Sequence, residues 1–317
     1  MKKYLITILS LIGFSLSACS KNLDRFNGVN TSIPNLTIIS PTGAPALGFY
    51  NLATSQNFET NADPTNIVKI MNAGQKDVVV LPTNAGVQNI VKNNAPYKIA
   101  ATITFGNFYV ASLNNDSNGE MDPSDVILLF QQNNVPDKLF HYIYGNDLNN
   151  GIHYVNAVSD VSKAIKDGFF VDAETGLQMV PNYVLIAEPA LSALSNITVY
   201  ADIQEKYREK NNDLDIYQAS IFIRNEVSKD QGDALLAKLK LDIEEAISDS
   251  NKLLEGMNKV ESASTVFGVA PQMAANVLKK NNGMGLGFKK AIENKTAIDQ
   301  FLSLFNIGET NEEIYYK

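Results

Sequence analysis

The sequence predicts an α/β protein, because short apolar, β-branched runs alternate along the chain with segments of helical periodicity. The first run, residues 36–39, reads Leu-Thr-Ile-Ile, as expected of a strand buried on both faces. A tight turn with glycine at position 43 follows it, and Pro45 lies where we expect a helix to begin. The same order of strand, polar turn and helix recurs at residues 77–91. Such units fall into two sets, one before about residue 112 and one after residue 114, so we expect two sheets.

Periodicity and turn residues predict the remaining elements. Further strands are expected at 57–60, 97–104, 108–112, 126–130, 152–158, 183–187, 197–201 and 215–222. Helices are expected at 46–53, 66–72, 136–144, 159–166, after Pro189, and at 231–254, 270–278 and 291–305. The last third of the chain should therefore be largely helical.

Length and composition describe a globular protein of more than one domain. A chain of 317 residues is too long for one ordinary core and suits two domains of about 100–150 residues. Apolar residues make up 45% of the chain and charged residues 19%, which excludes a disordered protein. The net charge of −8, without any basic block, argues against nucleic acid as a partner.

The sequence lacks the motifs of common catalytic and cofactor sites. It has no Gly-rich phosphate-binding fingerprint, no Gly-x-Ser-x-Gly elbow and no His-Glu-x-x-His. The two histidines, His141 and His153, lie on different expected elements, which argues against a zinc site built on histidines. We therefore expect no enzymatic activity, no cofactor and no metal.

The first nineteen residues resemble the signal peptide of a bacterial lipoprotein. Two lysines precede an apolar stretch at 4–16, which is too short to span a membrane comfortably. Small residues then lead to Cys19, the only cysteine of the chain. We expect 1–19 to be a signal peptide with its lipobox, Cys19 to be lipidated, and 20–34 to form a tether. The alternative is an ordinary secretory signal with a coincidental cysteine.

The order of these features resembles the substrate-binding lipoproteins of ABC importers, in particular the nitrate, sulfonate and thiamine-precursor type. The resemblance rests on the lipobox, the two sets of α/β units, the turns at 40–45 and 82–84, and the later Ala-Glu-Pro-Ala at 187–190. It implies a two-lobe, type II periplasmic-binding-protein-like fold, each lobe a mostly parallel sheet flanked by helices. It also implies a monomer, lipid-anchored on the extracytoplasmic face of a bacterial membrane, that delivers a small molecule to an ABC permease.

The resemblance also divides the chain. Lobe 1 is expected at 35–112, lobe 2 at 113–215, and a return to lobe 1 with the C-terminal helices at 216–317. The chain would cross between the lobes near 112–125 and 205–215. Ligand would lie in the cleft, in contact with strand-end loops of both lobes, and the lobes would close on it by a hinge motion.

Candidate ligand contacts lie at the expected strand ends, where polar side chains meet helix N-termini. In lobe 1 they are Ser40, Thr42, Gly43, Thr83, Asn84, Thr104, Phe105 and Asn107. In lobe 2 they are Gln131, Gln132, Asn133 and Glu188. The simpler interpretation is that these residues form turns, helix caps and solvated loops.

The candidates favour a neutral or amine-bearing ligand, such as a pyrimidine. Apart from Glu188 they are uncharged, and only Arg25, Arg208 and Arg224 are available to clamp an anion. Glu188 follows a buried strand, so it either caps a helix or accepts hydrogen bonds from a ligand amine. The alternative ligand is a sulfonate or another organic anion held by backbone N–H groups. Alternatives of another class are a two-lobed enzyme and an adhesion lipoprotein.

Replacement of Cys19 by alanine is expected to prevent lipidation, because it removes the thiol that carries the lipid. Cells grown with radiolabelled palmitate should label the wild-type protein and leave Cys19→Ala unlabelled. Ser20→Ala, one residue further along, is the matched control and should be labelled like the wild type. Equal labelling of Cys19→Ala would rule out an anchor at this residue.

Overall fold

The computed structural model describes residues 35–55, 57–113, 120–195, 197–280 and 282–317. Its strands are β1 (Ile38–Pro41), β2 (Phe58–Asn61), β3 (Val78–Pro82), β4 (Tyr97–Thr104), β5 (Phe108–Ser112), β6 (Ile127–Phe130), β7 (Ile152–Val155), β8 (Phe170–Val171), β9 (Gln178–Met179), β10 (Tyr183–Ala187), β11 (Thr198–Asp202), β12 (Ala219–Arg224) and β13 (Leu286–Lys290). The expected signal peptide, Cys19 and the tether lie outside the described residues.

The helices are α1 (Ala44–Leu47), α2 (Pro64–Asn72), α3 (Thr83–Asn93), α4 (Val135–Tyr144), α5 (Val158–Asp167), α6 (Ile203–Lys210), α7 (Lys229–Ser248), α8 (Ser250–Met257), α9 (Ala263–Phe267), α10 (Pro271–Lys279) and α11 (Lys295–Ser303). Four short 3₁₀ turns are η1 (Asn149–Gly151), η2 (Leu191–Ala193), η3 (Ile292–Asn294) and η4 (Glu312–Ile314). None of the helices in this part of the chain has both the length and the apolar character needed to cross a membrane.

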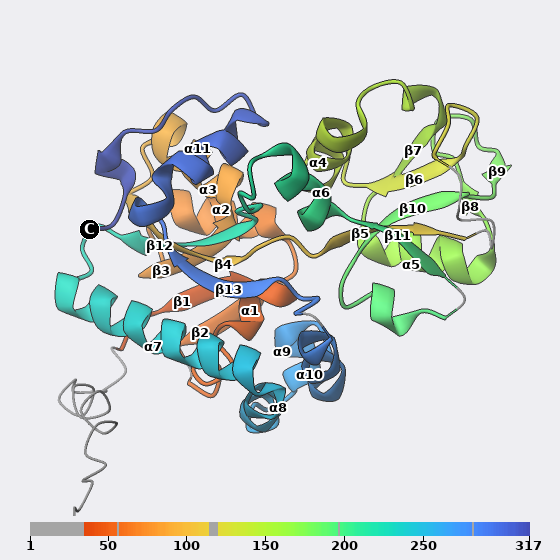
Figure 1. Ribbon diagram of the computed structural model, residues 1–317. Helices are drawn as coiled ribbons and strands as arrows, with labels where there is room; N and C mark the ends of the chain where they lie inside the picture. The colour runs from red at the N-terminus through yellow and green to blue at the C-terminus, as the bar shows by residue number, and fades with distance from the viewer. Residues whose placement is uncertain (1–34, 56, 114–119, 196, 281) are drawn as a thin grey trace, which may run out of the picture. The chain divides into compact units, whose positions relative to one another are not determined.

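The strands form two main sheets, which Figure 1 shows with their flanking helices. The first sheet has the order β13-β4-β12-β3-β1-β2, the second has the order β11-β5-β10-β6-β7, and β8 pairs with β9 in a separate two-stranded sheet. β1 is parallel to β2 and β3, and β6 is parallel to β7 and β10. β12 runs antiparallel to β3 and β4, and β5 runs antiparallel to β10 and β11. The expected α/β fold of two helix-flanked, mostly parallel sheets is confirmed. In the first sheet β12 and β13 run opposite to the other described strands, and in the second sheet β5 does.

β3 shows how the first sheet is covered on both faces. Its residues 78–81 are fully buried. Val78 and Val80 belong to a core cluster that includes side chains of α1, α7, α8 and α10, whereas Val79 and Leu81 belong to a second cluster that includes side chains of α2, α3 and α11. A strand covered on both faces needs apolar residues at every position, which is why its sequence is continuous rather than alternating.

The chain passes between the sheets earlier than expected. β5 belongs to the second sheet, so only Phe105, Gly106 and Asn107 separate it from β4. Our assignment of 108–112 to lobe 1, with a crossing near 112–125, is therefore wrong. The two strands have the same apolar alternation, and the change of sheet needs only a short turn in which Gly106 has a φ of +57°. The chain returns from β11 to β12 through α6 and residues 211–218.

Several local expectations also differ from the structure. The helix expected at 46–53 is the four-residue α1, because Tyr50 and Asn51 turn towards α7 and hydrogen-bond to Asp242. The helix expected after Pro189 is only the 3₁₀ turn η2. β13 and α6 were not expected. β13 contains two lysines and a glycine, and α6 is mostly charged, so neither has a strong apolar pattern.

Gly86→Ala is expected to destabilise the protein, although alanine is the better helix former. Gly86 lies in α3, and a Cβ there would come within 2.1 Å of the Phe222 ring of β12. Overpacking of this kind lowers the free energy of unfolding by about 1–3 kcal/mol, measurable by urea denaturation. Gly308→Ala is the control, because a Cβ at Gly308 meets nothing within 4 Å. A Gly86→Ala protein as stable as the wild type would contradict this close packing of α3 on β12.

Candidate functional site

Three buried hydroxyl groups join the ends of β3 and β4 to β12. Ser220 Oγ lies 2.7 Å from Thr83 Oγ1 and 2.8 Å from Thr102 Oγ1. All three residues are fully buried. Thr83 was an expected ligand contact, but its hydroxyl already has a partner within the sheet.

Three further oxygen atoms near these strand ends have no such partner. They are Asn84 Oδ1, Thr104 Oγ1 and Gln218 Oε1, here called the strand-end oxygens, and each is buried without a hydrogen bond to any described residue. Gln218 lies between the two strands: its N–H donates to Thr104 O and its carbonyl accepts from Thr83 N, both at 3.0 Å. Buried polar atoms are nearly always hydrogen-bonded. These oxygens therefore need a partner from outside the described residues, and a ligand or water can provide it.

Asn107 connects these strand ends to the second sheet. Its Nδ2 donates to the main-chain O of Glu188 at 3.2 Å, and its Oδ1 accepts from Gln218 Nε2 at 3.0 Å. The main-chain N of Glu188 also donates to Asn107 O at 3.0 Å. Asn107, an expected ligand contact, thus uses both polar atoms of its side chain within the protein.

Glu188 follows β10, and its side chain holds the turn that comes after it. Its two carboxylate oxygens accept hydrogen bonds from Ser192 N at 2.9 Å and from Ser192 Oγ at 2.7 Å. Of the two roles expected for Glu188, helix cap or ligand contact, these bonds correspond to the cap, although Glu188 holds the 3₁₀ turn η2 and not an α-helix. Glu188 also lines a hollow of about 500 Å³, which it shares with Phe105, Tyr109 and Gly283.

An ion-pair cluster lies at the same hollow. Asp215 Oδ1 accepts from Arg208 Nε at 2.9 Å, and Asp215 Oδ2 pairs with Lys289 Nζ. Burial alone would raise the pKa of Asp215, but the hydrogen bonds from Lys289 and Arg208 outweigh burial and hold it below its usual value. Lys289 Nζ also lies 5.5 Å from the centre of the Phe105 ring, which packs edge-on against Tyr217. Both cations therefore already have a carboxylate partner.

The turn after β1 is used mainly by the first sheet itself. Ser40 is fully buried, and its hydroxyl donates to Pro41 O at 3.0 Å. Gly43 N donates to Phe267 O at 2.8 Å, and Thr42 packs against Gly268. The helix N-terminus that we expected to bind ligand groups here belongs to a helix of only four residues, so few aligned peptide dipoles contribute to it.

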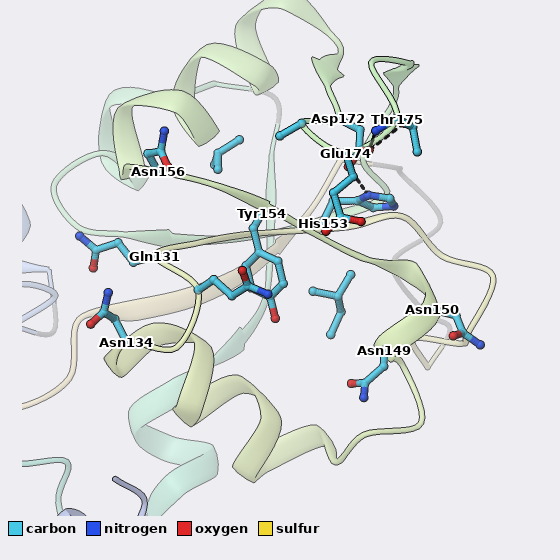
Figure 2. A pocket seen from close by; sticks show the side chains of 14 residues that line it. Gln131, Asn134, Asn149, Asn150, His153, Tyr154, Asn156, Asp172, Glu174 and Thr175 are labelled. Atoms are coloured by element: carbon cyan, nitrogen blue, oxygen red, sulfur yellow. Dashed lines mark hydrogen bonds and ion pairs between the residues drawn. The ribbon is translucent and has the colours of Figure 1, made fainter.

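Gln131 and Gln132 line a different hollow, shown in Figure 2. It has a volume of about 840 Å³ and lies along the edge strand β7. Its lining residues are Gln131, Gln132, Asn134, Asn149, Asn150, Ile152, His153, Tyr154, Val155, Asn156, Asp172, Ala173, Glu174 and Thr175. Asn133 lines neither hollow, and its N–H donates to Asp137 Oδ2 at 2.8 Å. The structure therefore does not bring these three residues to the hollow that Glu188 lines.

Gln218, Arg208 and Lys289 were missed by sequence reasoning. Gln218 falls inside the strand expected at 215–222, and that assignment gives it no functional role. The available signal was an amide that interrupts an apolar run, directly before the true start of β12. Arg208 and Lys289 lie on α6 and β13, the two elements that the apolar pattern did not reveal.

In the hollow along β7, His153 and Asp172 form a hydrogen-bonded pair (Figure 2). His153 Nδ1 lies 2.8 Å from Asp172 Oδ2, while Thr175 donates to Asp172 Oδ1 through its N–H at 2.8 Å and its hydroxyl at 2.7 Å. These bonds from Thr175 and His153 lower the pKa of Asp172 to about 2. The Thr175 hydroxyl donates to the carboxylate and not to the imidazole, so the three groups do not form a nucleophile–base–acid chain.

Asp172→Asn is expected to destabilise the protein at pH 7 and to lose this effect in acid. A carboxylate with a lowered folded-state pKa stabilises the fold above its unfolded pKa, 3.8 here, and this contribution is lost as the pH falls towards about 2. Urea denaturation at pH 7, 4 and 2.5 should therefore show a difference from wild type that shrinks with acidity. Asp147→Asn, at an exposed carboxylate, is the control. A difference that does not vary with pH would contradict the lowered pKa.

Neither a protein-family model nor a curated protein matches the chain. Solved structures do match it. The crystal structure of an ABC transporter from Parabacteroides distasonis has a TM-score of 0.66 at 16% identity, over 87% of this chain and 93% of that one. The periplasmic aliphatic sulphonate binding protein SsuA from Escherichia coli has a TM-score of 0.59 at 12% identity, over 86% and 87%.

A third similar structure is the ligand-binding component of an ABC-type import system from Staphylococcus aureus, with zinc bound. Its TM-score is 0.58 at 11% identity, over 88% of this chain and 95% of that one. Identities this low show a shared fold and nothing more about ligand or partner. The chain has the fold of the periplasmic binding proteins.

Proposed function

We propose that the chain is the solute-binding component of an ABC importer and that its ligand contacts the strand-end oxygens. The observation that carries the proposal is that Asn84 Oδ1, Thr104 Oγ1 and Gln218 Oε1 are buried without a partner among the described residues. An unsatisfied buried polar group costs about 1–3 kcal/mol, which a ligand that bonds to it would offset. Two similar structures are a sulphonate binding protein and a ligand-binding component of an ABC-type import system, which supports this role.

The proposal includes the location and partners expected from the sequence. Cys19 is the lipid attachment site, and the protein is held on the extracytoplasmic face of a bacterial membrane. It acts as a monomer and delivers its ligand to an ABC permease without altering it. The apolar stretch at 4–16 and the small residues before Cys19 support the anchor.

The ligand that we propose is a neutral or amine-bearing organic molecule. Two of the strand-end oxygens belong to amides and can only accept hydrogen bonds, so they suit N–H or O–H donors. A sulfonate is the alternative, since the Escherichia coli structure is that of a sulphonate binding protein. Against it, the cations Arg208 and Lys289 in the neighbouring hollow are already paired with Asp215.

The first test is a thermal-shift screen of the soluble 20–317 form, followed by calorimetry of every hit. Pyrimidines, primary amines, alkanesulfonates and inorganic oxyanions form the panel. A neutral or amine-bearing hit with saturable binding supports the proposal. Turnover of a compound would favour a two-lobed enzyme, and the absence of any saturable hit would favour an adhesion lipoprotein.

Thr104→Val is expected to weaken ligand binding without destabilising the free protein. Thr104 is fully buried, and its hydroxyl has no partner in the described chain, so an isosteric apolar residue removes only the bond to ligand. Loss of one such bond lowers the affinity for the hit about two- to tenfold, measurable by calorimetry.

The matched control for this substitution is Thr102→Val, two residues earlier on β4. The Thr102 hydroxyl is bonded to Ser220, so this variant should lose about 1 kcal/mol of stability and keep the wild-type affinity. A Thr104→Val protein with wild-type affinity, or with a clear loss of stability when free, would contradict the proposed contact.

Saturation with the hit is expected to make the protein more compact. Only residues 105–107 and 211–218 with α6 join the two sheets, so a hinge motion can bring them together. Small-angle X-ray scattering should show a smaller radius of gyration with ligand than without it. An unchanged radius, with saturation confirmed by calorimetry, would count against two mobile lobes.

A further inference from the structure

We infer that Gln218 determines which ligands the site accepts, because its side-chain amide is locked with the oxygen towards the ligand. This inference rests on the proposed function and adds the hydrogen-bonding class of the ligand. Gln218 Oε1 is buried and has no partner in the described part of the chain, whereas Gln218 Nε2 donates to Asn107 Oδ1 at 3.0 Å.

The orientation of the Gln218 side-chain amide follows from the main-chain carbonyl oxygen of Glu188. The main-chain carbonyl of Glu188 can only accept a hydrogen bond, so the Asn107 side chain must turn its NH₂ group towards it, at 3.2 Å. Asn107 Oδ1 then faces Gln218, which must supply an N–H. Rotation of either amide by 180° would place two donors or two acceptors opposite each other. The free atom of Gln218 is therefore fixed as an acceptor.

Hydrogen bonds of the main chain fix the position of this acceptor. The two side-chain hydrogen bonds from Gln218 to Asn107 and from Asn107 to the main-chain O of Glu188, here called the amide relay, fix its direction. Gln218 N donates to Thr104 O, and Gln218 O accepts from Thr83 N, each at 3.0 Å. The residue is thus held between Thr104, the last residue of β4, and Thr83, the first residue of α3, and Asn84 directly follows Thr83. A side chain held at its backbone and at its Nε2 has few other rotamers available, so ligand binding does not have to order it.

The complementary ligand presents hydrogen-bond donors, N–H or O–H. Two amide oxygens accept, and the Thr104 hydroxyl can donate or accept. A carboxylate, sulfonate or phosphate carries only acceptors at neutral pH and would face Gln218 Oε1 without a bond. An amidine, an aminopyrimidine or a primary amide carries adjacent N–H groups and can satisfy these oxygens. The ligand class is therefore a molecule with at least one N–H or O–H donor group, neutral or cationic.

The test compares benzamidine with benzoate, which share a skeleton and have opposite hydrogen-bonding groups, with neutral benzamide as a third probe. Binding is followed by ¹⁵N-NMR of the side-chain amides of the full soluble 20–317 form. We expect benzamidine and benzamide to shift the Gln218 side-chain signal saturably, and benzamidine to bind at least about tenfold tighter than benzoate. Tighter binding of benzoate, or no saturable shift with any probe, would overturn the inference.

Three variants test whether the preference for benzamidine over benzoate comes from the hydrogen bonds between Gln218 and Asn107 or from a general preference of the site for cations. Gln218→Met keeps the size of the side chain and should reduce the benzamidine-to-benzoate preference about tenfold. Asn107→Leu frees the Gln218 amide to rotate and should reduce the same preference while Gln218 is still present. Gln178→Met, at an exposed glutamine of β9, is the matched control and should behave like the wild type.

The outcomes distinguish this inference from the proposed function. If a solute from the screen binds and Gln218→Met leaves its affinity and the probe preference unchanged, the inference is wrong and the binding role stands. If no solute of the screen and no probe binds, both fail. If Asn107→Leu does not fold, as judged by its circular dichroism, Gln218→Met alone decides the question.

Discussion

The return of β12 to a place between β3 and β4 is the constraint on which the rest of the structure depends. The second sheet lies between β4 and β12 in the sequence, yet β12 pairs antiparallel with both of its neighbours in the first sheet. The chain must therefore leave the first sheet after Thr104 and re-enter it at Ala219. These two points are adjacent in space, since Ala219 pairs with Thr104. The two passages between the sheets consequently lie side by side, and both contribute to the candidate site.

The buried polar groups near β12 are of two kinds. Some are hydrogen-bonded to one another and stabilise the sheet, and others have no hydrogen bond to the described residues. The hydroxyls of Thr83, Thr102 and Ser220 satisfy one another, so they stabilise the sheet without any ligand. Thr104 and Gln218 lie further towards the passages, and their oxygens are unsatisfied within the described chain. A site at this boundary gains from burial, because hydrogen bonds are stronger where water is excluded. It also lowers the stability of the free protein.

Local patterns predicted the strands well, and non-local pairing explains most of the errors. The ranges expected for β4, β5 and β10 agree with the structure, because each is a run of buried or alternating residues. No local pattern says which sheet such a strand joins, so β5 was assigned to the wrong one. Gln218 was missed for the same reason: its importance comes from Thr83, Thr104 and Asn107, which are all distant in sequence. Among the expected contacts, Asn84 and Thr104 carry oxygens that have no partner among the described residues, whereas Ser40 and Thr83 are satisfied internally.

The charged residues of the neighbouring hollow disfavour an anionic ligand, as the hydrogen-bond direction at Gln218 does. Three cations, Arg208, Lys280 and Lys289, and four carboxylates, Glu188, Asp202, Glu205 and Asp215, line it. An anion that paired with Arg208 or Lys289 would weaken an ion pair of the buried Asp215, and it would enter a hollow in which carboxylates outnumber cations. A cationic or neutral donor requires no such exchange. Charge and hydrogen-bond direction arise from different residues, so their agreement is independent support for a ligand that donates hydrogen bonds.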